Sequence, residues 1–297
     1  MRADAEVRPL AIALALIVAF MVVEVVVGVL ADSLALLSDA AHMLIDAAAL
    51  ALSVWAARLA QRPAEGRMTF GFRRAEILSA QANAITLLVL GALIVFEAVQ
   101  RLMSPPSVDA PPVVLTALVG AAVNVVAIWQ VARANRENLN VEGSFQHLLT
   151  DFFAFAATVV AGTVIWITGF DRADAIASLG VAASMLYAAL PLLRRTGRVL
   201  LEAAPEGLRP EEVATAITAH PGVSSLHDLH VWEISSGFPS LSAHVLVARD
   251  EDCHRIRREL ETLLHERFGL DHTTLQVEHT SDRLLGISSL RTDHPDR

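Results

Sequence analysis

The sequence predicts an α-helical membrane protein with six transmembrane helices, followed by a small α+β domain. Two observations lead to this prediction. Hydrophobic residues make up 54% of the 297-residue chain, which is too apolar for an ordinary soluble protein of this size. The long apolar runs also lie almost entirely before residue 204, whereas the remainder has the mixed pattern of a soluble domain.

Six apolar segments are long enough to cross the hydrocarbon core of a bilayer as helices. The first is longer than the apolar region of a usual signal peptide and is interrupted by Glu24, so we expect it to be retained. Together they assign residues 1–204 to a six-span transmembrane domain. The segments cover residues 9–30, 34–60, 75–102, 112–132, 143–168 and 173–193.

Arginine placement predicts the orientation of these helices. All the basic residues of the chain are arginines, and they gather before the first segment, in the second and fourth connections, and after the sixth segment. The opposite connections contain only Arg172, with Arg101 at a helix end. Because positive residues stay in the cytoplasm, we expect a multi-pass protein of the cell membrane with both termini cytoplasmic.

The region after the sixth segment predicts a soluble cytoplasmic domain over residues 205–283, with a disordered tail at 284–297. The order of elements, αββαβ, predicts a small sheet covered on one face by two helices, as in ferredoxin-like and metallochaperone-like folds. The expected helices cover residues 210–220 and 252–268, and the expected strands cover 223–235, 241–249 and 273–279.

Charge and cysteine content narrow the class of partner. The net charge is −9; the first 204 residues hold 14 arginines against 16 acidic residues, and the remainder holds 9 against 16. An acidic, histidine-rich C-terminal domain suits divalent cations and argues against nucleic acid. The single Cys253 excludes a disulfide framework and a thiolate cluster within one chain.

Two copies of one spacing, His-x-x-x-Asp, occur inside the predicted spans. They are His42 with Asp46 in the second span and His147 with Asp151 in the fifth. Four residues make about one helical turn, so each pair lies on one helix face. Ionisable side chains at bilayer depth cost about 2.5–3.5 kcal/mol each on insertion scales and indicate function. Facing each other, the two pairs would form a four-ligand site for a metal ion.

The residue types predict which metal and which coupling ion. Two imidazoles and two carboxylates suit tetrahedral Zn²⁺, with Cd²⁺, Co²⁺ and Ni²⁺ as related ions, and two aspartates neutralise one divalent charge. Carboxylates left without metal repel each other and favour protonation, and imidazole binds metal only when it is neutral. Metal and protons therefore compete for the same atoms, which predicts metal/proton exchange.

The polar residues near these pairs are expected to have separate roles. Asp39 shares a face with His42 and Asp46 near the outer end of its span, where it either guides cations or starts the helix. Asn83 and Asn124 are expected to form hydrogen bonds between helices rather than to bind the ion. Arg73 is expected to anchor the cytoplasmic interface.

Three functions compete with transport. An intramembrane metal-dependent enzyme needs an open metal position and a general base, and the motif His-Glu-x-x-His is absent. A metal sensor would carry a catalytic or DNA-reading module, and none is visible. A channel is disfavoured because a closed four-ligand site binds its ion too tightly for rapid conduction. The sequence therefore predicts a transporter that moves the metal by alternating access, and not an enzyme.

Five motifs resemble the cation diffusion facilitator family over nearly the whole chain. The resemblance implies homodimers with six spans and an αββαβ cytoplasmic domain, which export Zn²⁺, Cd²⁺ or Co²⁺ across the cell inner membrane in exchange for protons. It also implies that the transport-site ligands are the four residues of the two pairs. The motifs are SLALLSDAAHMLID (33–46), TFGFRRAEIL (69–78), HLLTD (147–151), DAIASL (174–179) and HDLHVW (227–232).

The resemblance also extends to the cytoplasmic domain. His227, His244 and His279 match positions that bind metal at the dimer interface of some relatives, although surface histidines explain each of them equally well. Metal bound there would act as a regulatory ligand that tightens the dimer. The chain departs from the family at Arg73, where relatives often have a histidine, and in lacking a histidine-rich insertion at 133–143.

Overall fold

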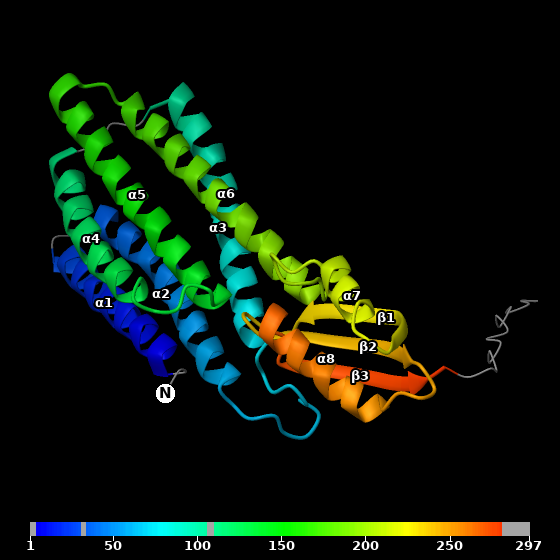
Figure 1. Ribbon diagram of the computed structural model, residues 1–297. Helices are drawn as coiled ribbons and strands as arrows, with labels where there is room; N and C mark the ends of the chain where they lie inside the picture. Colours follow the sequence, from blue (N-terminus) through cyan, green and yellow to red (C-terminus); the bar gives the residue numbers. More distant parts are fainter. Residues whose placement is uncertain (1–3, 31–33, 106–109, 281–297) are drawn as a thin grey trace, which may run out of the picture. The chain divides into compact units, whose positions relative to one another are not determined.

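Six long helices come first along the chain and are followed by an α/β segment, as the computed structural model in Figure 1 shows. The structure describes residues 4–30, 34–105 and 110–280, except the side chains at 4–6, 27, 28 and 34–42. The predicted tail lies outside this part. Each of the six helices is long and apolar enough to cross a membrane. They are α1 (Asp4–Leu30), α2 (Leu34–Ala60), α3 (Ala75–Met103), α4 (Ala110–Val131), α5 (Leu139–Thr168) and α6 (Arg172–Leu200).

Three helices extend by four or more residues beyond the apolar segments that predicted them, and the first of these is α1, which begins at Asp4. Helix α5 begins four residues earlier, because the Asn138 side chain caps it by accepting hydrogen bonds from the backbone N–H groups of Asn140 and Val141. Helix α6 continues through Pro191 to Leu200, over about two further turns that contain Arg194 and Arg198. Hydropathy locates only the apolar part of a helix, so the polar end turns fell outside the predicted segments.

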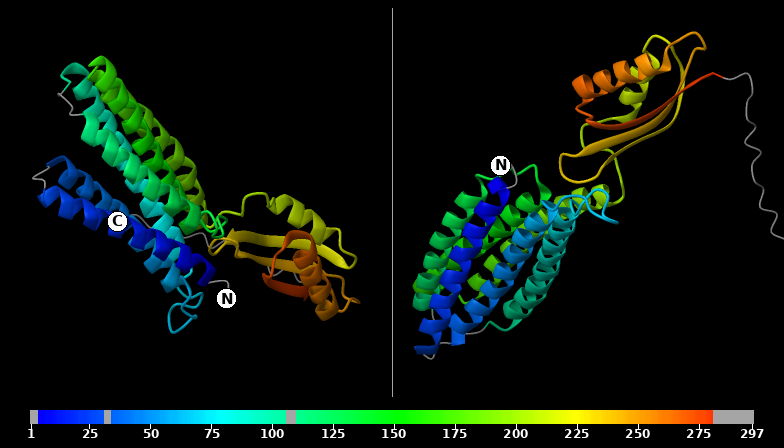
Figure 2. Two further views of the ribbon diagram at one scale, coloured as in Figure 1. Left: turned by 90° about the vertical axis from the view of Figure 1, so that its left-hand side faces the viewer. Right: turned by 90° about the horizontal axis from the view of Figure 1, so that it is seen from below.

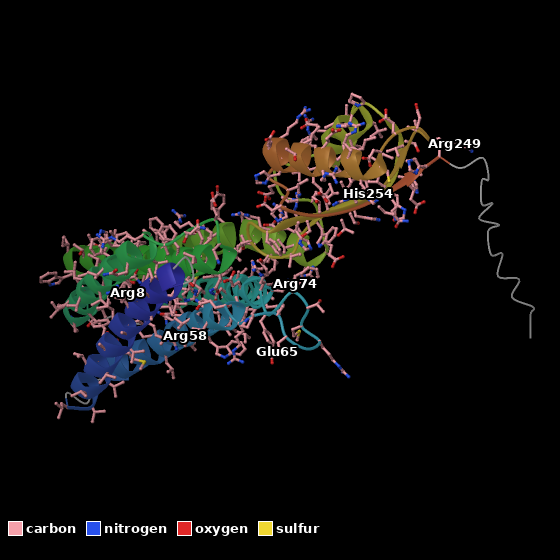
Figure 3. All side chains as sticks on the ribbon, turned by 60° about the horizontal axis from the view of Figure 1, so that its bottom comes forward. Arg8, Arg58, Glu65, Arg74, Arg249 and His254 are labelled. Atoms are coloured by element: carbon pink, nitrogen blue, oxygen red, sulfur yellow. The ribbon has the colours of Figure 1, made fainter. Side chains whose placement is uncertain are left out.

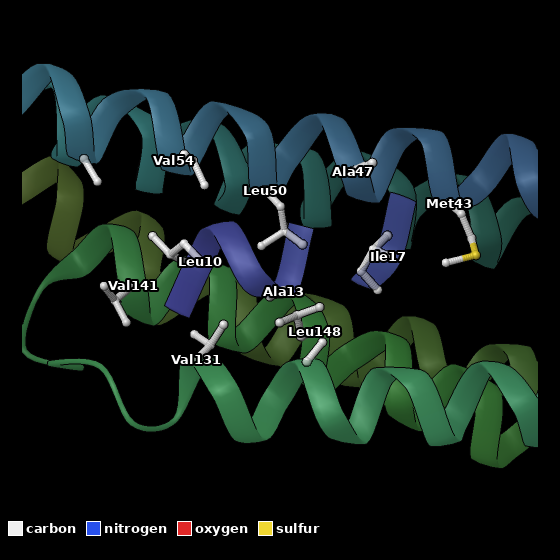
Figure 4. Close-up of a cluster of buried hydrophobic side chains, with 12 residues drawn as sticks. Leu10, Ala13, Ile17, Met43, Ala47, Leu50, Val54, Val131, Val141 and Leu148 are labelled. Atoms are coloured by element: carbon white, nitrogen blue, oxygen red, sulfur yellow. The ribbon is translucent and has the colours of Figure 1, made fainter. Parts of the chain in front are cut away.

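The six helices pack into three buried clusters, of which two involve buried residues of α5 and the third joins Leu87 of α3 to Val181, Met185 and Ala189 of α6. The first joins α1, α2, α4 and α5 (Figure 4). The second joins α3, α5 and α6, so that α5 takes part in both. Views from two further directions show the six helices side by side (Figure 2). The first core consists of Leu10, Ala13, Ile17, Met43, Ala47, Leu50, Val54, Ala57, Ala127, Val131, Val141 and Leu148.

Glycines bring α4 and α5 close together. A Cβ atom at Gly120 would lie 2.5 Å from the Phe155 ring, and one at Gly162 would lie 2.6 Å from Val114. Small residues at helix interfaces are the usual device for close packing in membranes. Large apolar side chains such as Trp129 and Trp166 are exposed instead, as lipid contact requires.

One end of the six helices is rich in arginine, and we call it the arginine-rich end. The start of α1, the end of α2 and the start of α3 carry Arg8, Arg58 and Arg74, which Figure 3 labels. Because the helices alternate in direction, the starts of α1, α3 and α5 and the ends of α2, α4 and α6 all lie at this end. The two predicted metal pairs lie along α2 and α5, away from it.

The C-terminal elements form a three-stranded sheet with two helices. The strand order is β1-β2-β3, and β2 pairs with β3 in parallel, from Ser240 opposite His272 to Val247 opposite His279. The order αββαβ is as predicted. The elements are α7 (Pro210–Thr218), β1 (Val223–Glu233), β2 (Pro239–Val247), α8 (Cys253–Phe268) and β3 (His272–His279).

Both helices cover the same face of this sheet. Alternate β2 residues from Leu241 to Val247 point into one core with Val213 and Ile217 of α7 and Leu260 of α8. Two apolar helix stripes thus bury one sheet face, which is the arrangement predicted from the amphipathic patterns.

The chain divides into two compact units. The first comprises Met1–Ala203 together with Glu233–Phe238, and the second comprises Ala204–Trp232 and Pro239–Arg297. The short segment Glu233–Phe238 contacts the helices of the first unit: Ser236 Oγ accepts a hydrogen bond from the Leu139 N–H at 3.0 Å. The sequence did not indicate this grouping, since the segment reads as a plain turn between two strands.

The cap of α8 predicts a pH-dependent effect. The Asp252 carboxylate accepts hydrogen bonds from the backbone N–H groups of Arg255 and His254, and the bond from Arg255 contributes most to lowering the pKa of this carboxyl. Because the pKa is lower in the folded protein, the ionised carboxylate stabilises the helix at all pH values above the ordinary carboxyl range. This stabilisation is lost as the pH falls through the pKa of the folded state. We expect Asp252→Ala to speed amide hydrogen exchange in the first turn of α8 at neutral pH but not in acid. The exposed Asp250→Ala is the control and should have no effect at either pH.

Candidate metal centre

The His147–Asp151 pair of α5 contacts α2 at Asp46. His147 of α5 is 1% exposed, and its Nε2 lies 3.0 Å from Asp46 Oδ1 of α2. The apolar packing of α2 on α5, through Leu50 and Leu148, holds the two helices at this distance. Two helices separated by about a hundred residues thus bring a histidine and a carboxylate together.

Asp151 completes the group. It lies one turn beyond His147 on the same face of α5, and its Oδ2 is 3.9 Å from His147 Nε2. One ligand atom from each of Asp46, His147 and Asp151 lies within 4.8 Å of the others, and this is the only such group of three in the part of the chain that the structure describes.

The chemistry of these atoms suits a divalent cation. The side chains of Asp46 and Asp151 are 21% and 14% exposed, so the two carboxylates are poorly hydrated. Asp151 Oδ2 and His147 Nδ1 accept or donate no hydrogen bond among the described groups. Buried polar atoms without partners are costly, and a cation bound by the two carboxylates and by His147 Nε2 would relieve that cost at Asp151 Oδ2.

Three of the four predicted ligands are therefore brought together. His42 lies on α2 one turn before Asp46, but its side chain and that of Asp39 are outside the described part. The fourth ligand and the accessory role of Asp39 stay predictions.

A polar cluster lies beside the site, toward the arginine-rich end. Ser53 of α2 accepts a hydrogen bond on its Oγ from Asn83 Nδ2 of α3 at 3.1 Å and one on its backbone oxygen from Asn140 Nδ2 of α5 at 2.8 Å. The expectation that Asn83 bonds between helices is confirmed. Ser53 and Asn140 were missed, because a serine in an apolar helix and an asparagine at a helix start are common without any such role.

The C-terminal histidines are only partly brought together. The rings of His227 and His244 lie 5.2 Å apart between centroids, and Asp228 Oδ2 is 3.9 Å from His244 Nε2. His230 Nε2 also contacts Asp228 at 2.9 Å. His279 instead bonds the backbone oxygen of Glu251 at 2.8 Å.

The backbone conformation of Asp228 explains why two histidines of β1 lie on the same side of the sheet. Its φ of 54° is left-handed, which interrupts the alternation of a regular strand. In a regular strand His227 and His230 would point to opposite faces, yet His230 and His244 both approach the Asp228 carboxylate. A metal site on this domain stays a prediction.

Arg73 packs against an aromatic ring, and its role as an anchor at the cytoplasmic interface stays a prediction. Its guanidinium lies over the Phe238 ring, 4.6 Å from the centroid, within the first unit. Its neighbour Arg74 donates a hydrogen bond from Nε to the Ile234 backbone oxygen at 3.3 Å.

The chain is similar in sequence to known families and proteins. The family model described as cation efflux transmembrane domain matches residues 10–201, and the model described as cation efflux protein, cytoplasmic domain, matches residues 205–280. The metal cation efflux system protein CzcD of Cupriavidus metallidurans is 37% identical over 91% of this chain and 86% of its own length. The zinc transporter ZitB of Escherichia coli is 35% identical over 93% and 88%. The cadmium, cobalt and zinc/H(+)-K(+) antiporter of Bacillus subtilis is 32% identical over 92% and 89%.

Proposed function

The chain belongs to the cation diffusion facilitator family of metal cation efflux transporters, and we propose on that basis that it exports Zn²⁺ from the cytoplasm in exchange for protons. Its family consists of transporters rather than enzymes. The observation that carries the proposal is the group of Asp46, His147 and Asp151, a buried imidazole and two half-buried carboxylates between two membrane-spanning helices.

The metal would be held by this group, with His42 as the fourth ligand. Imidazole nitrogen favours Zn²⁺ over the oxygen-seeking Mg²⁺ and Ca²⁺, with Cd²⁺ and Co²⁺ as alternative cargo. The names of the relatives, which include a zinc transporter and a cadmium, cobalt and zinc antiporter, support this choice.

Protons would be exchanged at the same atoms. When the metal leaves, two carboxylates less than 5 Å apart remain in a poorly hydrated site, where their repulsion favours proton uptake. Metal returning to the site then displaces those protons. Alternating exposure of the site to the two sides of the membrane converts this competition into exchange.

We further propose cytoplasmic termini and a homodimer. Arginines at one end of the six helices support the orientation through the positive-inside rule. The match of residues 205–280 to the family's cytoplasmic domain supports the assignment of that domain. His227 and His244, with Asp228 beside them, are the residues we assign to a regulatory metal on it.

Transport by purified protein in proteoliposomes tests the proposal. We expect Zn²⁺ uptake when a pH gradient drives protons in the opposite direction, and loss of uptake when a proton carrier collapses the gradient. The same assay with Cd²⁺, Co²⁺ and Mn²⁺ ranks the cargo. Zn²⁺ uptake that is indifferent to the pH gradient would contradict proton exchange, and absence of uptake for every metal would contradict export.

A further inference from the structure

We propose that the cluster of Ser53, Asn83 and Asn140 is the gate that closes the ion pathway on the arginine-rich side of the metal centre. We call these three residues the polar gate. The inference rests on the proposed function, since it assigns a role in the transport cycle to residues outside the metal centre.

The polar gate ties three helices together through one residue. Ser53 of α2 receives the side-chain amide of Asn83 from α3 and that of Asn140 from α5, and its own hydroxyl donates to the Ala49 backbone oxygen at 3.1 Å. Ser53, Asn83 and Asn140 are 0%, 2% and 0% exposed. Breaking these two interhelical bonds would free α2 from both neighbours at this level.

The position of the gate is set by the two helices that carry the metal residues. Ser53 lies seven residues after Asp46 on α2, and Asn140 lies seven residues before His147 on α5. Because α2 and α5 run in opposite directions, both displacements lead toward the arginine-rich end, by about 10 Å. An ion that reaches Asp46 and His147 from that end must pass this level.

The helices are packed more closely at this level than beyond the metal centre. Eight of the α5 residues from Leu139 to Thr150 are buried, and only three further along the helix. A Cβ atom at Gly143 would lie 3.3 Å from Leu192 of α6 and 3.5 Å from the Ala80 backbone of α3. The helices are thus densely packed between the polar gate and the metal centre, whereas the Asp46 and Asp151 side chains of the centre itself are partly exposed.

One atom of the gate indicates that it is built to open. Asn140 Oδ1 is buried and accepts no hydrogen bond from the described groups. An unpaired buried acceptor raises the free energy of the closed arrangement, so this arrangement is held by two bonds and opposed by one missing bond. Hydroxyl and amide groups released on opening would line the pathway with polar atoms, as a passing cation requires.

The test is a labelling experiment that does not depend on transport. In a Cys253→Ser background, Ser144→Cys places a thiol on α5 between the gate and His147, at a position that is 1% exposed. A membrane-impermeant maleimide is added from the arginine-rich side of oriented vesicles without metal. We expect Asn83→Ala and Ser53→Ala each to raise the labelling rate about tenfold, because each removes the same bond that favours the closed state.

Three control variants separate a gate from a merely structural bond. Thr196→Val removes a buried hydroxyl that bonds only its own helix, through the Leu192 and Leu193 oxygens, and should leave labelling unchanged. The double variant Asn83→Ala/Ser53→Ala should label no faster than either single variant. Ser53→Thr keeps the hydroxyl and should label like the parent, and Ser53→Ala carries the test in the case in which Asn83→Ala fails to fold.

The outcomes are distinct. Unchanged labelling in folded Asn83→Ala and Ser53→Ala, or an equal rise in Thr196→Val, would overturn the gate. If the parent moves no metal while labelling responds as expected, the proposed function fails and the gate stands as a conformational element. If the parent transports Zn²⁺ and labelling does not respond, only the gate fails.

Discussion

Replacing Asp151 with alanine is expected to abolish metal transport and to weaken Zn²⁺ binding by at least about 100-fold, the upper range seen when only an outer partner of a metal ligand is lost. Without Asp151, a divalent ion between α2 and α5 has one carboxylate fewer to neutralise it in a poorly hydrated site. Proteoliposome uptake and calorimetric titration of the purified protein measure the two effects. Asp46→Ala should behave in the same way.

The metal-free protein provides the internal check on this result. Removing one of two carboxylates that repel each other should leave the melting temperature of the metal-free protein unchanged or higher, while the increase caused by Zn²⁺ disappears. Thr150→Ala is the matched control, because Thr150 is buried next to Asp151 but bonds only the His147 backbone oxygen of its own helix. Full transport by Asp151→Ala, or equal loss in Thr150→Ala, would contradict the assigned site.

Replacing His147 with aspartate is expected to change which metal is carried. The group would then present three carboxylates and lose the described imidazole, so its preference should move from Zn²⁺ toward Mn²⁺, Mg²⁺ or Ca²⁺. We expect the ratio of Zn²⁺ to Mn²⁺ affinity to fall by about tenfold or more, in line with the cost of altering a metal's ligand shell. Competition titrations of the two metals on one preparation give this ratio directly.

A carboxylate added beside the site serves as the control for this exchange. Gln146 precedes His147 on α5, and its amide bonds Glu142 at 2.7 Å rather than the metal group. Gln146→Asp adds a negative charge but keeps the imidazole, so it should leave the metal ratio unchanged. A similar ratio change in both variants would mean that net charge, and not the imidazole, determines the preference.

Much of the fold was predictable because membranes impose simple rules. A helix that crosses a bilayer needs about 20 apolar residues, so six segments were visible without any knowledge of their neighbours. The αββαβ order followed from alternating and amphipathic patterns in the C-terminal domain. The ends of α5 and α6 were not predictable from hydropathy, because the cap at Asn138 and the arginines of α6 are polar.

The candidate site was predictable for the opposite reason, which is that it breaks the membrane rule. Four ionisable residues in apolar helices are conspicuous, and the spacing of four places each pair on one helix face. Ser53 and Asn140 are inconspicuous by comparison, since neutral polar residues cost little in a helix. His279 was grouped with His227 and His244 by resemblance, whereas in the single chain it bonds the Glu251 backbone.

The sequence by itself determined the helices, their alternation and the relation of His147 to Asp151, because these depend on local periodicity and on the cost of polar groups in lipid. Only the tertiary structure decided that Asp46 lies 3.0 Å from His147 and that Ser53 joins α2 to α3 and α5. Such contacts depend on which helix faces pack together, through Leu50 and Leu148 among others. Packing of this kind is a property of the whole set of helices, so no single segment encodes it.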